Sequence, residues 1–187
     1  MSLSSPAPRS HVHTRQVQCQ GYERKDGLWD IEGRMTDIKT YDMKNIDRGG
    51  LIPAGEALHD MSIRLTIDLE FKIHKVEAVI DYAPFNLCPS IAQRFQQLEG
   101  KSIAPGWTRL TKQLFSGTQG CTHLMELLGP IATTAIQATH LARSREAENS
   151  GNNSKPVMLN TCHALADSGD VVRRLWPDHY RPQPETN

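Results

Sequence analysis

Apolar and polar residues alternate along two stretches in the first half of the chain, residues 29–36 and 61–67. A period of two is typical of a strand with one buried face. The second alternation continues past residue 67, which is longer than the usual strand of about 5–6 residues. We therefore expect a hairpin that turns near residues 68–70 and returns from Phe71 to Tyr82. The inward positions of the return strand would be Val76, Ala78 and Ile80.

The spacing of apolar residues becomes helical after residue 87. Pro89 suits the first turn of a helix that begins at Cys88, and Gly100 can end it. A second, short helix begins near Trp107 and ends near Gly117. A third begins near residue 122, and Gly129-Pro130 is expected to kink it or split it in two. Its apolar stripe is Leu124, Leu127, Leu128, Ile131 and Ala135.

Strands that precede helices predict an α+β fold, with a small antiparallel sheet and helices packed on one of its faces. We expect one domain over residues 25–180, after a mostly flexible segment 1–24 that could hold a strand from Val12 to Cys19. A loop is expected at residues 48–55. The later features expected are a surface linker at 143–155, a hairpin at 157–172 and a loose tail at 181–187.

Composition excludes several classes of protein. The formal net charge is +0, so no nucleic-acid surface is expected. Apolar runs are too short for a membrane-spanning helix, and residues 1–10 lack the apolar region of a secretory signal. Four cysteines without such a signal are typical of reduced thiols in the cytoplasm. The expected protein is therefore cytoplasmic and does not bind membranes. A small-molecule substrate is the partner that fits best.

The residues best suited to chemistry lie at the start of the third helix. Cys121 and His123 are two positions apart, and Glu126 shares a helical face with His123. Cys88 also stands at a helix N-terminus, where partial positive charge favours the thiolate. Next to the strongest strand, His59-Asp60 adds an imidazole and a carboxylate. Thiolate, imidazole and carboxylate ligands suit a zinc or iron ion.

Other residues have plainer interpretations. Each cysteine, taken alone, is as often a small buried hydrophobe as a ligand. We interpret Glu32 and Asp37 as part of a solvated strand face, although either could act as a general base if the sheet faces a ligand. His13 is interpreted as a solvated histidine of the N-terminal segment. Whether Cys162 or His163 joins the pocket is left open.

Five motifs occur in order and together resemble an uncharacterised bacterial domain family, a domain of unknown function. The resemblance extends from about Val12 to Tyr180 and implies no established activity. The motifs are Gly27-Leu28-Trp29-Asp30-Ile31-Glu32-Gly33-Arg34, Ile52-Pro53-Ala54-Gly55-Glu56, His59-Asp60-Met61, Pro105-Gly106-Trp107-Thr108-Arg109 and Gly120-Cys121-Thr122-His123-Leu124.

Residues 57–138 also resemble the U-type iron–sulfur cluster scaffolds of the iron–sulfur and nitrogen-fixation systems. His59-Asp60 matches the scaffold's Cys-Gly-Asp, and Cys88 matches its middle cysteine. The break Gly100-Lys101-Ser102 and the pair of Cys121 with His123 follow in the scaffold's order. The resemblance implies that Asp60, Cys88, Cys121 and His123 converge at one end of the sheet. Because only two of the three cluster cysteines are present, it favours a single metal ion over a cluster.

Three functions follow from these residues. The first is a metal-binding domain that holds zinc or iron through Cys88, Cys121 and His123, with His59 or Asp60 completing the shell and Glu126 orienting His123. The second is a small metal- or thiol-dependent enzyme, a hydrolase or lyase, that acts on a small organic substrate and uses Cys121, His123 and Glu126 in catalysis. The third is an interaction module without chemistry.

Overall fold

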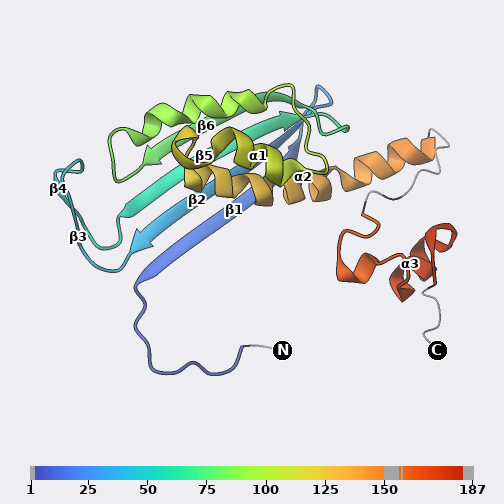
Figure 1. Cartoon of the computed structure of the whole chain (residues 1–187), viewed down its shortest axis with the longest axis horizontal. Coiled ribbons are helices and arrows are strands. Elements are labelled where there is room, and N and C mark those ends of the chain that lie inside the picture. Colours follow the sequence, from blue (N-terminus) through green and yellow to red (C-terminus); the bar gives the residue numbers. More distant parts are fainter. Residues whose placement is uncertain (1–2, 150–155, 157, 183–187) are drawn as a thin grey trace. The chain divides into compact units, whose positions relative to one another are not determined.

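The computed structural model describes residues 3–149, 156 and 158–182 (Figure 1). The chain divides into two compact units, residues 1–142 and 143–187. The first unit contains a four-stranded antiparallel sheet in the order β1-β2-β5-β6. Its strands are β1 (His13–Glu23), β2 (Trp29–Lys39), β5 (Ala57–Ile67) and β6 (Ile73–Tyr82).

The centre of the sheet follows the alternation in the sequence. Leu65 on β5 lies between Ile31 on β2 and Val76 on β6, and all three are at most 1% exposed. The hairpin between β5 and β6 turns at the expected place. There the Asp68 side chain accepts hydrogen bonds from the backbone N–H groups of Glu70 and Lys72, which stabilises the turn.

The structure forms a strand over the eleven residues of β1. The strand expected from Val12 to Cys19 within the mostly flexible segment is therefore present, and it is longer than expected. The hydrophobic pattern indicates this strand only weakly, because its helix-facing positions include His13, Arg15 and Gly21, which are not large apolar residues. Pairing with β2 over its whole length holds β1 in the sheet, and tertiary pairing commonly overrides weak intrinsic preference.

A small second sheet interrupts the expected loop between β2 and β5. It pairs β3 (Met43–Asn45) with β4 (Gly50–Ile52). The Asn45 side chain donates a hydrogen bond to the carbonyl oxygen of Pro84, and the backbone N–H of Asn86 donates to Asp47. These bonds fasten the hairpin to the segment that follows β6.

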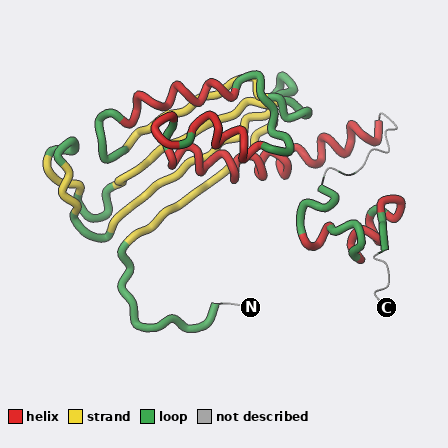
Figure 2. Tube along the Cα trace, in the orientation of Figure 1, coloured by secondary structure: helices red, strands yellow, loops and turns green. Residues whose placement is uncertain are grey.

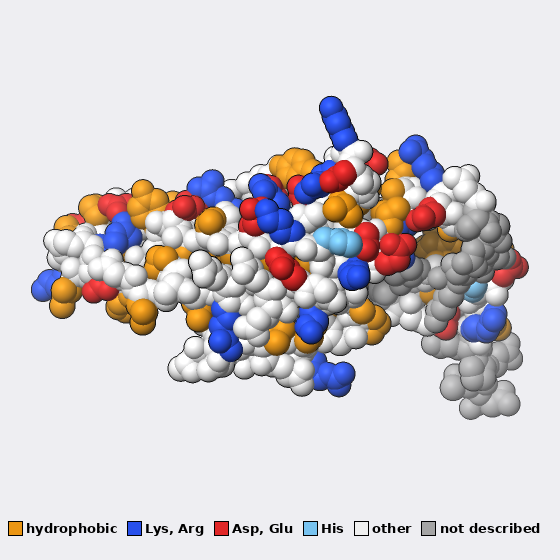
Figure 3. Space-filling view, turned by 90° about the horizontal axis from the view of Figure 1, so that it is seen from above, with side chains coloured by type: hydrophobic (Ala, Val, Ile, Leu, Met, Phe, Trp, Pro, Cys, Tyr) orange, Lys and Arg blue, Asp and Glu red, His pale blue; other side chains and the backbone are white. Residues whose placement is uncertain are grey.

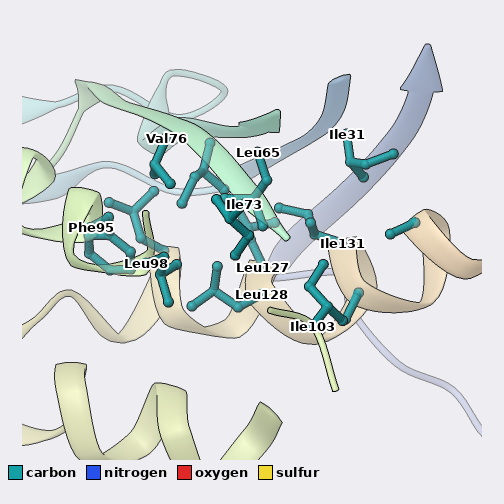
Figure 4. Packing of buried hydrophobic residues seen from close by; sticks show 14 of the residues in the cluster. Ile31, Leu65, Ile73, Val76, Phe95, Leu98, Ile103, Leu127, Leu128 and Ile131 are labelled. Atoms are coloured by element: carbon teal, nitrogen blue, oxygen red, sulfur yellow. The ribbon is translucent and has the colours of Figure 1, made fainter. Parts of the chain in front are cut away.

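Helices cover one face of the main sheet (Figures 1 and 2). They are η1 (Cys88–Leu98), α1 (Trp107–Phe115), η2 (Gly117–Gln119) and α2 (Thr122–Asn149). Their apolar side chains interleave with those of the sheet, as Figure 4 shows for Leu98, Leu127 and Leu128 beside Ile73. Phe95 stacks on Phe115 with ring centroids 4.3 Å apart. The architecture confirms the predicted α+β class.

Helix α2 crosses the sheet at close range because two facing strand positions are glycines. A Cβ atom at Gly33 would stand 2.7 Å from Cδ1 of Ile131, and one at Gly21 would overlap the Cβ of Ala138. Pro130 lies inside α2 and does not split it, contrary to one expectation. The buried residues on both sides of the proline hold the two halves against the sheet.

Residues 143–187 form the second unit. Here α2 continues to Asn149 through residues for which a linker was expected, because arginine, alanine and glutamate favour helices. The rest of that linker, residues 150–155, lies outside the described residues, as does Val157. The expected hairpin is wrong for the described residues of 157–172, which instead form η3 (His163–Leu165) and the start of α3 (Asp170–Leu175). Asp170 in the first turn of α3 and Arg173-Arg174 in the last complement the helix dipole. A further turn, η4, spans Pro177–His179.

Two further observations concern membrane-spanning helices and the distribution of surface charge. None of the helices formed by the described residues is long and apolar enough to cross a membrane. On the face shown in Figure 3, acidic and basic side chains are interspersed, and no large area of a single sign is visible.

Candidate functional site

Asp37 is a buried carboxylate at the end of β2. It follows Trp29, Ile31, Gly33 and Met35 on the strand face that the helices cover, and it is 1% exposed. Its strand neighbours are Arg15 on β1 and His59 on β5, in direct register on either side. The hydrophobic face of the sheet therefore ends in a row of ionisable side chains.

Three side chains from the neighbouring strands bind the carboxylate of Asp37. Arg15 makes a bidentate contact, with Nε 2.8 Å from Oδ1 and Nη2 2.8 Å from Oδ2. Nδ1 of His59 lies 2.9 Å from Oδ2, and Nε2 of His13 lies 3.1 Å from Oδ1. Nδ1 of His13 is buried and has no hydrogen-bond partner among the described residues.

Helix α2, which covers this face of the sheet, contributes a fourth side chain near the carboxylate of Asp37. Nε2 of His123, in the first turn of α2, lies 3.9 Å from Oδ2 of Asp37. The rings of His123 and His59 are 3.9 Å apart between centroids and tilted by 34°. On the other side of the His123 ring, Sγ of Cys121 lies 4.0 Å from Nδ1. The two imidazoles thus lie side by side over one carboxylate.

The charges of the site leave Asp37 ionised. Burial opposes its ionisation, but the hydrogen bonds and charge of Arg15, with a smaller effect of His59, lower the pKa of Asp37 to about 2. Burial lowers the pKa of His59, and the neighbouring His123 lowers it further. Burial and the charge of Arg15 lower the pKa of His123. Both imidazoles are therefore predominantly neutral at pH 7, the form in which histidine binds metal ions.

Asp37, His59 and His123 form a group that could hold a cation. One ligand atom of each lies within 4.8 Å of those of the other two. Zinc with nitrogen or oxygen ligands at about 2.0–2.1 Å requires ligand atoms about 3.3 Å apart in a tetrahedral shell. The separations of 2.9 Å and 3.9 Å from Asp37 Oδ2 to the two imidazoles bracket that value. The spacing of these side chains is therefore of the order that a single ion requires.

Two of the sequence-predicted ligands come together here, and Cys121 lies beside one of them. His59 and His123 belong to the group of three, whereas Cys121 and Cys88 do not. Cys88, at the start of η1, is partly buried against the hydrophobic core. Asp60 follows His59 on β5, so its side chain projects to the opposite face of the sheet, where both carboxylate oxygens accept hydrogen bonds from Arg34.

Glu126 has a different partner from the one expected. Its carboxylate accepts a hydrogen bond of 2.6 Å from Nη1 of Arg15 rather than orienting His123. The guanidinium of Arg15 thus bridges Asp37 on β2 and Glu126 on α2. Cys162 and His163 belong to the second unit, residues 143–187.

Sequence reasoning missed Arg15 and His13 and placed Asp37 on the wrong face. A signal for Asp37 was present, because it continues the odd-numbered inward positions of β2. The signal for Arg15 is weaker, because only Val17 and Cys19 mark the inward face of the strand that carries it.

The fold and the site define a small α+β domain with a histidine–carboxylate cluster at one end of its sheet. Residues 13–137 match the family model described as "Protein of unknown function (DUF2889)", and the chain belongs to this family. That span includes all the residues of the cluster. No curated protein and no solved structure matches the chain. The likeness to iron–sulfur scaffolds has no support from these comparisons and stays a prediction.

Proposed function

We propose that this domain binds a single zinc or iron ion through Asp37, His59 and His123. The observation that carries the proposal is the convergence of these three side chains from β2, β5 and α2 within 4.8 Å. Two histidines and one carboxylate form a recurrent ligand set for both metals, and it leaves coordination positions open.

The electrostatics of the site support a bound cation. Asp37 and Glu126 carry two negative charges, and Arg15, which bonds to both, carries one positive charge. With neutral imidazoles, the cluster keeps one net negative charge, which favours a divalent ion. Arg15 fixes the orientation of the Asp37 carboxylate, as hydrogen-bonding partners of metal ligands commonly do.

Metal content per chain tests the proposal. The protein is purified without a histidine tag, incubated with zinc or with iron(II) under anaerobic conditions, dialysed and analysed by elemental mass spectrometry. We expect about one ion per wild-type chain and a loss of most of it in His59→Ala and in His123→Ala.

His74→Ala is the matched control, because His74 pairs with Asp68 at the opposite end of the sheet. This variant should keep the full metal content. A wild-type protein that binds no ion, or equal losses in all three variants, would contradict the proposal.

A second candidate is a thiol-dependent hydrolase or lyase that acts on a small organic molecule. The contact of 4.0 Å between Sγ of Cys121 and Nδ1 of His123 favours it, because an adjacent imidazole can accept the thiol proton. In the metal-free protein, iodoacetamide would then alkylate Cys121 faster than the more exposed Cys162, and His123→Ala would remove the difference. Slower alkylation of Cys121 than of Cys162 would exclude an activated thiol.

A further inference from the structure

The outer edge of β1 is unpaired in the part of the chain that the structure describes. β1 is the first strand of the sheet order and pairs only with β2 (Figure 2). The edge is eleven residues long, and residues 16–22 contain neither a charged side chain nor a proline. Natural sheets usually protect edges with such residues, because a long uncharged edge pairs readily with another strand.

Two β1 strands paired antiparallel would place compatible side chains opposite one another. In an antiparallel pair of two β1 strands centred on Cys19, Gln18 would lie opposite the partner's Gln20, and Gln16 opposite the partner's Tyr22. Neutral polar groups would then line the outer face. On the inner face, Arg15 would lie opposite the partner's Glu23, a pair of opposite charges. No like charges oppose each other along residues 15–23 in this register.

Helix α2 gives a second reason for this register. It lies over Gly33 on β2 at Ile131 and over Gly21 on β1 at Ala138, so the helix runs toward the free edge. One turn further on, Leu141 is 59% exposed. Val17, on the helix-facing side of β1, is 46% exposed. With Gly21 opposite the partner's Val17, Leu141 would lie close to that valine, and the two exposed apolar side chains would cover each other.

We propose that two copies of this chain associate through β1, in antiparallel register about Cys19, to form a continuous eight-stranded sheet. A two-fold axis at Cys19 makes the interface self-complementary, as in most homodimers. Each copy would bury the uncharged stretch 16–22 of its edge strand and place Leu141 close to the partner's Val17. The proposed dimer shares Arg15 with the proposed metal site but requires no bound ion.

The molar mass in solution tests the association. By light scattering we expect the wild-type chain to have twice the 20.9 kDa of one copy. Val17→Lys should reduce the mass to that of one copy at the same concentration, because a charge pointing inward at an edge opposes pairing. Val79→Lys is the matched control. Val79 is 51% exposed on β6, away from β1, and its variant should remain dimeric.

Hydrogen exchange and circular dichroism separate loss of pairing from loss of folding. Amides of residues 16–22 should exchange faster in Val17→Lys than in the wild type, while those of β5 stay protected and the far-ultraviolet spectrum is unchanged. A monomeric wild type up to its solubility limit would overturn the proposal. So would a dimer that survives Val17→Lys, or one that Val79→Lys disrupts equally.

Discussion

Asp37 is the residue on which the site depends. A carboxylate that is almost fully buried would normally resist ionisation, yet Arg15, His13 and His59 surround it with donors from two neighbouring strands. The arrangement explains why an acidic residue can continue a hydrophobic strand face. It also means that the charge state of one side chain affects both the stability of the sheet end and the affinity for a cation.

Acid should therefore destabilise the domain through Asp37. Its pKa is about 2 in the folded state against 3.8 in the unfolded chain, so the unfolded state binds more protons as the pH falls from 4 to 2. The stabilisation is present above pH 4 and is lost toward pH 2, and it amounts to about 2 kcal/mol. Urea unfolding between pH 5 and pH 2 should show a drop in the free energy of unfolding that is smaller in Asp37→Asn.

Asp81→Asn provides the control for this comparison, because Asp81 is exposed on β6. Its unfolding free energy should follow that of the wild type across the same pH range. If Asp37→Asn and the wild type lose stability in parallel, the carboxylate does not carry the effect.

At the scale of elements, strands with a regular apolar alternation could be predicted from the sequence. The full length of a strand that is held mainly by pairing with its neighbour could not. The β5–β6 hairpin could be predicted because Met61 to Ile67 alternate without interruption. The strand at β1 was expected only from Val12 to Cys19, because histidine, arginine and glycine occupy several of its inward positions and pairing with β2 extends it to Glu23. For the candidate site, residue type singled out His59 and His123, which the structure brings together with Asp37, whereas Asp60, also expected as a ligand, lies on the opposite face of the sheet.

The contact between α2 and β1 predicts the effect of two glycine substitutions. Gly21→Ala would place a methyl group against Ala138, so either the helix or the strand must move, at a cost of about 1–3 kcal/mol. Gly129→Ala, inside α2, has nothing within 4 Å of the added Cβ and should stabilise the helix by about 0.5–1 kcal/mol. Thermal unfolding measures both effects.

An equal change in the two glycine variants would contradict the close approach of α2 to β1. A stabilised Gly21→Ala would contradict it more directly, because that result requires free space over the strand.

At the scale of the whole molecule, every residue of the proposed site lies in the first unit. Residues 1–142 contain the sheet, the covering helices and the ends of β1, β2, β5 and α2 that carry the cluster. The family match ends at residue 137, inside the same unit. The site should therefore depend on this unit alone.

A chain that ends at Ala142 should fold cooperatively and bind metal with the stoichiometry of the full chain. Its hydrophobic core is complete, since the cluster of buried apolar residues extends from Trp29 to Ala135. Circular dichroism and elemental analysis of the shortened chain test this. A folded but metal-free product would show that residues 143–187 contribute to the site.

The most direct test of the account is X-ray absorption at the metal edge of the zinc-loaded protein. We expect nitrogen and oxygen ligands at about 2.0–2.1 Å, with outer-shell scattering from two imidazoles. His123→Ala should reduce the imidazole signal to one. A sulfur ligand at about 2.3 Å would assign the metal to a cysteine, and a spectrum without imidazole scattering would contradict binding by His59 and His123.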